Sequence, residues 1–436
     1  MKTDPPHILC VNPWIHDFAA YDFWAKPLGL LTIAAILRRS GIRISYLDCL
    51  DRFHPREKRP VKTLWDGRGP YRKTPIDFKK ALSSQPDPPL DRPDPGQPFS
   101  RYGIRPQWFA RDLANLDRPD LILVTSMMTY WASGVAETIA QIKAVYPDVP
   151  VVLGGVYASL CADHARSHSG AARVVPGPCE QVLPDIIREF TGYETTLGLD
   201  VHDLDSYPFP ALDLLHHLAY APIMTSRGCP FSCEYCASSF LEPQLRRRSP
   251  DHVFREIRHW HQTLGIRNFA FYDDALLVNP KQYAFPLFEK LIESGMDLMF
   301  HTPNALHIRE IDDRAAGLMF RAGFKTIRLG LETTEFSKMR AHDIKVKKNE
   351  FSGAVKALKK AGFTPAQMGA YLLCGLPGQD MEALEKSMEL VRNKGLTPTL
   401  AFYTPIPHTA MWDEAVKGAR FDIRRHPALT NNTLFP

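Results

Sequence analysis

Three of the eight cysteines in this 436-residue chain lie within eight residues, at Cys229, Cys233 and Cys236. Cysteine thiolates are the usual ligands of a [4Fe–4S] cluster, and three of them leave one iron without a protein ligand. That iron can accept the amino and carboxylate groups of a small molecule, so the spacing predicts a cluster that takes part in chemistry. A zinc site completed by a distant fourth ligand and three unrelated buried thiols are the alternatives.

These cysteines directly follow the first strand of a series in which strands and helices alternate. We expect strands at residues 221–226, 268–273, 298–302, 325–332, 369–375 and 399–404, and helices near 250–264, 280–294, 309–322, 348–361 and 379–394. Six such strands predict a partial (β/α)6 barrel over residues 220–412, open on one side. Parallel barrels place their chemistry at the carboxyl ends of the strands, which is where the cysteines lie.

The cysteine spacing, with an aromatic residue before the last cysteine, resembles the radical S-adenosylmethionine (SAM) superfamily. The segments YDDALL, after the second strand, and LGLETT, ending the fourth, also carry the resemblance. It implies that the open iron binds the methionine part of SAM and that an electron from the cluster releases a 5′-deoxyadenosyl radical. The SAM-binding residues that it implies are Tyr235, Asp273, Asp274, Asn304 and Glu332.

Some of these assignments have plain structural alternatives. Asp273 or Asp274 could cap the next helix, Glu332 could be a surface charge, and Asn304 could be an ordinary rim residue. The segments GLPGQD and YTPIPHT also match the family, although the family often has glycine where His408 stands.

The N-terminal half shows an earlier alternation of strands and helices. Strands are expected at residues 7–12, 42–48, 121–126, 149–155 and 172–177, with helices at 29–41, 134–145 and 180–190. Interleaved helices and apolar strands predict a doubly wound, Rossmann-like parallel sheet. The fold class is therefore α/β, with this sheet over residues 1–200, a polar linker at 201–219, the barrel, and a C-terminal tail at 413–436.

This half resembles the cobalamin-binding domain that precedes many radical SAM barrels. The segments VNPW, KPLGLLTIAAILRRSG, VTSMMTYW, VVLGGVYAS and GPCE carry the resemblance. Two adjacent glycines after a strand allow a nucleotide tail to approach the backbone closely. The cobalamin-binding residues implied are Asn12, Trp14, Ser126, Met127, Tyr130, Gly154, Gly155, Tyr157 and Gly177.

One motif departs from the histidine-ligating cobalamin domains, which carry D-x-H-x-x-G after the first strand. Here Trp14 stands for the Asp and Ala19 for the Gly, so His16 lacks both supports. We therefore expect that His16 does not coordinate cobalt. Trp14, Tyr130 and Trp131 could crowd that face of cobalamin, or they could be core residues.

Residues 52–106 form a basic, proline-rich insertion in the first domain. This stretch holds 13 Lys or Arg, 6 Asp or Glu and 11 of the 37 prolines. Such a composition excludes a long helix or a central strand. A solvated surface insertion is the plain interpretation. An RNA-gripping arm is the alternative, with Trp65, Tyr71 and Tyr102 as candidates to stack on bases.

Bulk composition narrows the class of protein. Few, unevenly spaced cysteines indicate reduced thiols and a cytoplasmic location. The longest apolar run, residues 28–37, is too short to cross a membrane. A small-molecule substrate and an electron donor such as flavodoxin or ferredoxin are expected.

The first functional hypothesis is cobalamin-dependent methylation of an unactivated carbon or phosphorus centre. One alternative keeps the radical chemistry but gives rearrangement, ring formation or sulfur insertion. Another is that the chain is not an enzyme but an iron–sulfur protein with a nucleic-acid-binding or regulatory role. The sequence does not identify a substrate or further catalytic residues.

Overall fold

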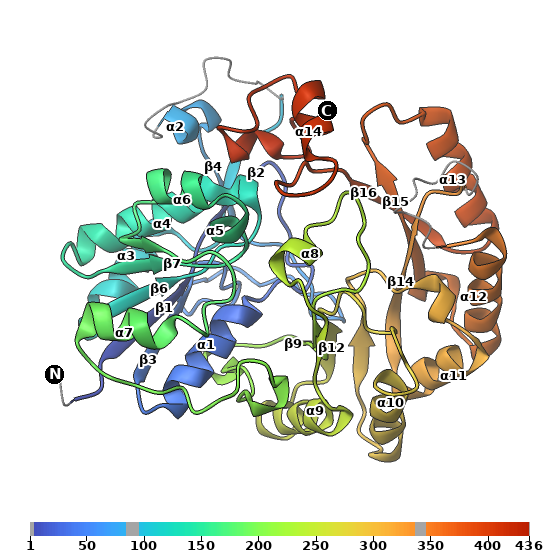
Figure 1. Cartoon of the computed structure of the whole chain (residues 1–436), viewed down its shortest axis with the longest axis horizontal. Coiled ribbons are helices and arrows are strands. Elements are labelled where there is room, and N and C mark those ends of the chain that lie inside the picture. The colour runs from blue at the N-terminus through green and yellow to red at the C-terminus, as the bar shows by residue number, and fades with distance from the viewer. Residues whose placement is uncertain (1–3, 84–95, 336–345, 436) are drawn as a thin grey trace. The chain divides into compact units, whose positions relative to one another are not determined.

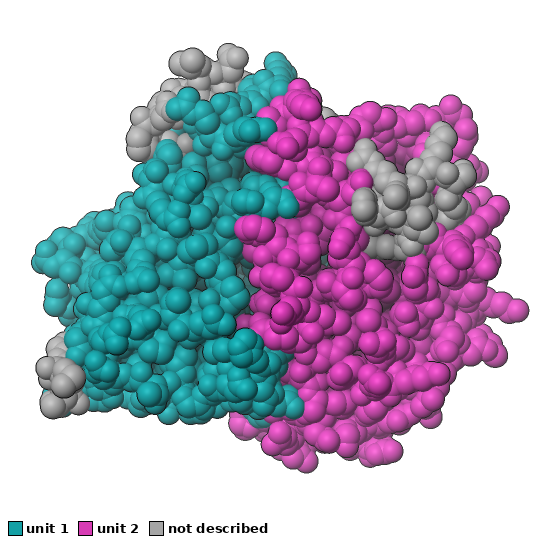
Figure 2. Space-filling model, in the orientation of Figure 1, with its two compact units in different colours: residues 1–218, 406–408, 419–435 teal, residues 219–405, 409–418, 436 magenta. Residues whose placement is uncertain are grey.

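The computed structural model describes residues 4–83, 96–335 and 346–435. The chain divides into two compact units, which Figure 2 colours separately. Unit 1 comprises residues 1–218, 406–408 and 419–435, and unit 2 comprises residues 219–405, 409–418 and 436. The stretch expected to be a C-terminal tail is thus divided between both units. The prolines between residues 84 and 95 of the basic insertion lie outside the described residues.

Unit 1 contains the predicted parallel sheet (Figure 1). Its strands are β1 (His7–Asn12), β3 (Arg43–Asp48), β6 (Leu121–Val124), β7 (Val151–Leu153) and β8 (Arg173–Val174), in the order β3-β1-β6-β7-β8. The chain leaves β1 for β3 on one side and later returns to β6 on the other. This reversal is the topological switch point, where open α/β sheets bind their ligands beyond the carboxyl ends of the strands.

Helices cover both faces of this sheet, which explains why its strands are continuously apolar. Successive residues of β1 point to opposite faces. Ile8 and Cys10 pack in a core with α1 (Leu28–Arg39) and α7 (Leu183–Thr191). Leu9 and Val11 pack with α3 (Pro106–Ala114), α4 (Ala132–Val145) and α5 (Val156–Leu160). α6 (Ala162–His168) follows α5 directly.

The basic insertion is more ordered than its composition suggests. Within it, β4 (Lys73–Pro75) and β5 (Ser100–Tyr102) form an antiparallel sheet with β2 (Ile15–Asp17), and α2 spans Phe78–Ser83. Tyr71 and Tyr102 are buried, whereas Trp65 is 61% exposed. The idea that Tyr71 and Tyr102 stack on nucleic-acid bases is therefore wrong, because their rings are needed in the core.

Unit 2 contains the predicted open barrel. Its parallel strands are β9 (Ala221–Ile223), β12 (Asn268–Phe271), β13 (Met299–His301), β14 (Phe324–Glu332), β15 (Met368–Cys374) and β16 (Thr397–Phe402). They are ordered β16-β15-β14-β13-β12-β9, so consecutive strands pair and the two end strands remain edges. The partial barrel predicted from the sequence is confirmed.

Five helices of unit 2 lie near the ranges that the sequence predicts: α9 (Pro250–Leu264), α10 (Ala284–Glu293), α11 (Asp313–Ala322), α12 (Lys348–Ala361) and α13 (Met381–Asn393). A further helix, α14 (Trp412–Gly418), is not predicted from the sequence, because this stretch is expected to begin a tail. α9 begins at a serine cap, where the Ser249 hydroxyl oxygen accepts a hydrogen bond from the His252 amide. None of the helices in the described ranges has the length and apolar character needed to cross a membrane.

Candidate cofactor sites

The three clustered cysteines lie in a loop that is closed at its base by a short antiparallel pair. β10 (Ser226–Arg227) precedes the loop and pairs with β11 (Arg246–Arg247) after it. Gly228 has a φ of 83°, and a side chain there would place its Cβ 2.6 Å from the Gln244 carbonyl oxygen. Only glycine fits at this turn, which leads directly into Cys229.

The cysteines themselves are partly shielded thiols. Cys233 is buried, Cys229 and Cys236 are half-buried, and the Cys236 amide donates to the Cys233 carbonyl at 3.0 Å. Among the described residues, no three His, Cys, Asp or Glu side chains converge on one ion position. In a [4Fe–4S] cluster each thiolate binds a different iron, so the three sulfurs need not converge on one point. The donor set of three thiolates on one loop fits such a cluster.

The two adjacent aspartates after β12 have different surroundings. Asp273 is buried, and its carboxylate accepts hydrogen bonds from the Thr225 amide, the Thr225 hydroxyl at 2.6 Å and the Ser226 hydroxyl at 2.7 Å. Burial raises the pKa of Asp273, against the lowering effect of these hydrogen bonds. Its oxygens therefore hold the end of β9 and the start of the cysteine loop in place.

Asp274, in contrast, is exposed and contacts Ser238 and the predicted SAM-binding residue Asn304. One of its oxygens accepts a hydrogen bond from the Ser238 hydroxyl at 2.8 Å, and the other lies 3.4 Å from the Asn304 amide nitrogen. Asn304 also donates to the Tyr272 carbonyl at 2.8 Å. The structure thus brings Asp274 and Asn304 together beside the cysteine loop. Of the two aspartates, Asp274 has the carboxylate that a ligand can reach.

Glu332 ends β14 in an unusual backbone conformation. Its φ is 64°, and the register of the β14–β15 pair shifts between Gly330 and Glu332. A non-glycine residue in the left-handed region costs about 1 kcal/mol or more, and such strain gathers at functional sites. The Glu332 side chain is only 9% exposed, so the interpretation as an ordinary surface charge is wrong.

Two other motif residues have informative positions. Tyr235 is half-buried in the cysteine loop. His408 has a φ of 67°, a backbone conformation that glycine adopts readily and that is strained for histidine. The His408 Nε2 atom lies 3.2 Å from the Leu160 carbonyl oxygen.

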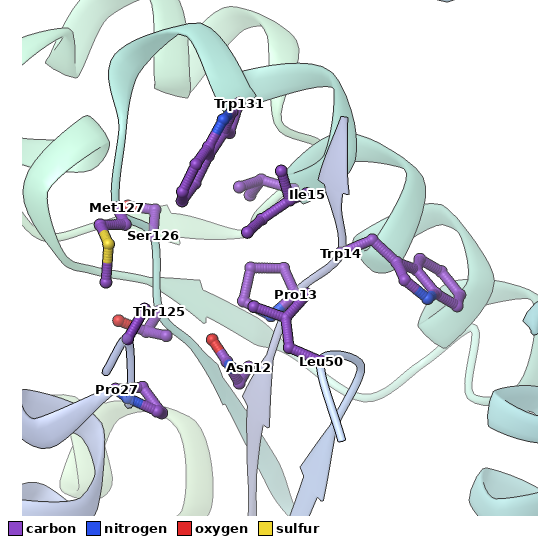
Figure 3. Close-up of a pocket in the computed structure, with 12 residues that line it drawn as sticks. Asn12, Pro13, Trp14, Ile15, Pro27, Leu50, Thr125, Ser126, Met127 and Trp131 are labelled. Atoms are coloured by element: carbon purple, nitrogen blue, oxygen red, sulfur yellow. The ribbon is translucent and has the colours of Figure 1, made fainter. Parts of the chain in front are cut away.

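In unit 1, a solvent-open pocket of about 470 Å³ lies at the switch point of the sheet. Its walls come mainly from the end of β1 and the segments after β1 and β6, and they include four predicted residues, Asn12, Trp14, Ser126 and Met127 (Figure 3). Asn12 donates to the Asp48 carboxylate at 2.7 Å. Trp14 contributes to the wall, but its indole points away from the pocket in Figure 3.

The core location of the Trp14 indole decides between its two interpretations. The indole nitrogen donates to the Ile104 carbonyl at 2.8 Å, and the ring packs edge-on against Phe109. Trp14 is 1% exposed. Its ring is therefore a core residue, and any contact with a ligand in the pocket comes from its backbone.

The double glycine after β7 forms a tight crossing with the segment after β6. Gly155 has a φ of 94°, and an added Cβ would lie 2.3 Å from the Ser126 carbonyl oxygen. Gly154 has open space where its Cβ would be. The Ser126 hydroxyl donates to the Gly154 carbonyl at 2.7 Å, so its proton is already engaged.

The remaining predicted cobalamin residues separate into surface and core positions. Gly177 has a φ of 76° with open space beside it, and its amide donates to the Ser159 hydroxyl at 2.8 Å. Tyr130 is half-buried. Tyr157 is buried, and its hydroxyl lies 2.6 Å from the His164 Nδ1 atom.

His16 has both ring nitrogens engaged within unit 1. Its Nδ1 lies 3.1 Å from the Ser133 hydroxyl, and its Nε2 lies 2.8 Å from Glu137. Arg101 binds the same carboxylate. Burial lowers the pKa of His16, against the raising effect of Glu137. The His16 imidazole is buried within unit 1, with an oxygen atom close to each ring nitrogen.

Sequence reasoning missed a polar group that orients one wall of the pocket. The Trp131 indole nitrogen donates to Asp17 at 2.6 Å, and the Asn431 amide donates to the other Asp17 oxygen at 2.8 Å. Burial raises the pKa of Asp17, and these hydrogen bonds oppose that rise. Asp17 and Asn431 are 414 positions apart, so no local pattern links them.

Both domains match known family models. Residues 223–391 match the radical SAM superfamily, and residues 104–187 match the B12 binding domain. The second range begins at the end of the basic insertion, so β1, α1 and β3 lie outside it. The fold and these matches define a radical SAM domain that follows a B12-binding domain in the chain. These domains imply a [4Fe–4S] cluster, SAM and cobalamin as cofactors.

Individual relatives are distant. An uncharacterized methyltransferase of Pyrococcus horikoshii is 25% identical over 330 residues, which cover 68% of this chain and 70% of that protein. An anaerobic magnesium-protoporphyrin IX monomethyl ester cyclase of Cereibacter sphaeroides is 24% identical over 336 residues, covering 68% of this chain and 53% of that protein. The solved structure of TsrM, a radical SAM methyltransferase from Kitasatospora setae with cobalamin and a [4Fe–4S] cluster bound, has a TM-score of 0.66. It is 15% identical and covers 95% of this chain and 78% of that one.

Proposed function

We propose that this chain is a cobalamin-dependent radical SAM methyltransferase that methylates an unactivated carbon or phosphorus centre of a small molecule. One observation carries the proposal. A three-cysteine loop at the carboxyl end of a parallel barrel occurs in the same chain as a B12-type sheet with a pocket at its switch point. A cobalamin-dependent radical SAM methyltransferase needs both sites, because the radical derived from SAM activates the substrate and cobalamin carries the methyl group.

In this proposal, the residues of unit 2 hold the cluster and SAM. Cys229, Cys233 and Cys236 are the cluster ligands, and the cluster supplies the electron that cleaves SAM. Asp274 takes the SAM amino group, because its carboxylate is exposed and sits beside the cysteine loop. Asn304 fixes one Asp274 oxygen. Glu332 and Tyr235 complete the SAM site, and Asp273 positions the loop without touching SAM.

In unit 1, residues 1–200 form the proposed cobalamin-binding domain. Asn12, Ser126 and Met127 line its pocket. Gly154 and Gly177 offer open backbone to the nucleotide tail, and Gly155 maintains the crossing that exposes Gly154. His16 does not ligate cobalt, because both of its nitrogens are engaged. Residues 201–219 link this domain to the barrel at residues 220–412.

Catalysis also needs a low-potential electron donor, which we assign to a flavodoxin or ferredoxin. Ring formation is the second candidate reaction, because one relative is a cyclase that matches 68% of the chain. The two candidates differ in their products. Methyl transfer consumes two SAM molecules and releases S-adenosylhomocysteine together with 5′-deoxyadenosine. Ring formation by a radical releases 5′-deoxyadenosine without S-adenosylhomocysteine.

The test is anaerobic turnover of reconstituted protein with cobalamin, a reductant and SAM labelled in its methyl group. We expect both nucleoside products, and the label in the substrate once one is supplied. The variant with Cys229, Cys233 and Cys236 changed to alanine is the control and should hold no cluster and form neither product. Protein that binds its cluster and releases 5′-deoxyadenosine but never takes up cobalamin contradicts the methyltransferase proposal.

A further inference from the structure

One side chain beside the cysteine loop contacts both a predicted cluster ligand and a predicted SAM ligand. The Ser238 hydroxyl oxygen lies 3.2 Å from the Cys236 sulfur and 2.8 Å from an Asp274 carboxylate oxygen. The Ser238 amide nitrogen lies 3.4 Å from the same sulfur. Ser238 begins α8 (Ser238–Leu241), so its backbone is held by that turn.

The chemistry of these three groups creates a competition. A serine hydroxyl has one proton to donate. As a free thiol, Cys236 donates to the Ser238 oxygen while Ser238 donates to Asp274. A cluster-bound thiolate has no proton, so the Cys236 sulfur becomes an acceptor. The sulfur and the Asp274 carboxylate then compete for the single hydroxyl proton.

Asp274 keeps the hydroxyl proton while no ammonium group pairs with its carboxylate. The sulfur is the weaker acceptor, because a cluster-bound thiolate shares its charge with iron, whereas the carboxylate oxygen of Asp274 lies at 2.8 Å and carries negative charge. An ammonium group that pairs with Asp274 neutralises that charge and supplies other donors to its oxygens. The Asn304 amide already occupies the second oxygen, so the newcomer takes the one that Ser238 holds.

We propose that Ser238 is a positioning residue that couples occupancy of Asp274 to the reduction potential of the cluster. The hydroxyl proton faces Asp274 in the SAM-free enzyme and turns to the Cys236 sulfur when the SAM amino group pairs with Asp274. A hydrogen bond to a cluster sulfur stabilises the extra electron of the reduced cluster and raises its potential. This inference rests on the proposed function, since it takes the cluster and SAM sites as assigned.

The expected size follows from one charge-assisted hydrogen bond. The cluster potential changes by the difference between the strength of this hydrogen bond in the reduced and in the oxidised cluster, and we expect that difference to change the reduction equilibrium about tenfold. For one-electron reduction, a tenfold change corresponds to about 59 mV. Reduction would thus become easier only when SAM is in place, which limits wasteful electron transfer to other acceptors.

The experiment is an anaerobic reductive titration of reconstituted protein followed by electron paramagnetic resonance. The ligand is S-adenosylhomocysteine, which keeps the amino acid part of SAM but has no cleavable sulfonium. We expect the ligand to raise the cluster potential of the wild type more than that of Ser238→Ala. Expressed as the equilibrium constant for reduction, the difference between the two ligand effects should be at least tenfold. Ser238→Thr keeps the hydroxyl and should behave as the wild type.

A double-mutant cycle separates the hydroxyl from the charge. Asp274→Ala removes a negative charge and frees the Ser238 proton, so its ligand-free potential should rise. Adding Ser238→Ala to Asp274→Ala should lower that potential again, by an amount that corresponds to about a tenfold smaller equilibrium constant for reduction. This comparison needs no ligand. Iron content is measured for each variant.

The outcomes distinguish the inference from the proposed function. A ligand that changes neither the potential nor the spectrum of the wild-type cluster overturns the assigned SAM site. A ligand effect that is equal in wild type and Ser238→Ala overturns the role of Ser238 alone. Equal potentials of Asp274→Ala and the double variant also overturn that role.

Discussion

Replacing Gly155 with alanine gives a sharp test of the crossing between the segments after β6 and β7, where we propose that the cobalamin tail binds. Gly155 has φ 94° and ψ −169°, a conformation that is essentially restricted to glycine and costs other residues about 1–3 kcal/mol. The new Cβ would also lie 2.3 Å from the Ser126 carbonyl oxygen and 2.6 Å from its amide nitrogen. That carbonyl accepts the Val156 amide at 2.9 Å, so moving it weakens a hydrogen bond worth about 1 kcal/mol.

We therefore expect Gly155→Ala to lose about 2–4 kcal/mol of unfolding free energy and to bind cobalamin much more weakly. Chemical denaturation measures the first quantity, and absorbance titration with cobalamin measures the second. Gly154→Ala is the matched control, because its Cβ meets no atom within 4 Å. It should keep the parent stability while its methyl group obstructs the cobalamin tail. A Gly155→Ala variant as stable as Gly154→Ala would refute the reasoning.

Four further predictions follow from single side chains. His16→Ala should leave the spectrum of bound cobalamin unchanged but lower stability, because Glu137 loses a buried partner; a changed cobalt spectrum would contradict this. Burial lowers the pKa of His164 from 6.5 to about 3. Below pH 6.5 the unfolded chain therefore binds more protons at this site than the folded chain, and the protein becomes less stable as the pH is lowered. That loss should reach about 2 kcal/mol between pH 7.5 and pH 5 in denaturation curves, and His164→Gln should flatten it. Ser249→Ala should cost about 1 kcal/mol by removing a helix cap, with iron content and cobalamin binding unaffected. Glu332→Gly should be about 1 kcal/mol more stable than Glu332→Ala, because glycine relieves the positive φ, while both bind SAM less tightly and keep their iron; equal stability of the two would remove the case for strain there.

Much of the fold could be predicted because its elements have local causes. The strands of both units are short apolar runs between amphipathic helices, and their order along the chain leads to parallel sheets. The helix expected near residues 250–264 is α9, which begins at Pro250 directly after the Ser249 cap. The cysteine loop could also be placed, because it follows a strand directly and its spacing is specific.

What the sequence could not predict depends on contacts between distant segments. β2 has three residues and no readable alternation, and its partner β5 lies about 85 positions later. Tyr71 and Tyr102 sit in a basic, proline-rich stretch, so composition suggested exposure where the fold buries them. Asp17 acquires its role only when Asn431 reaches it from the far end of the chain.

The aspartate pair shows this division most clearly. The sequence by itself determined that two carboxylates follow the second barrel strand, beside the cysteine loop. It could not distinguish them, because adjacent identical residues have the same local signal. Only the tertiary structure decided, since backbone direction buries Asp273 against Thr225 and Ser226 and leaves Asp274 exposed beside Ser238. Burial and partners are properties of the packed chain, and they separate a structural carboxylate from one that a ligand can reach.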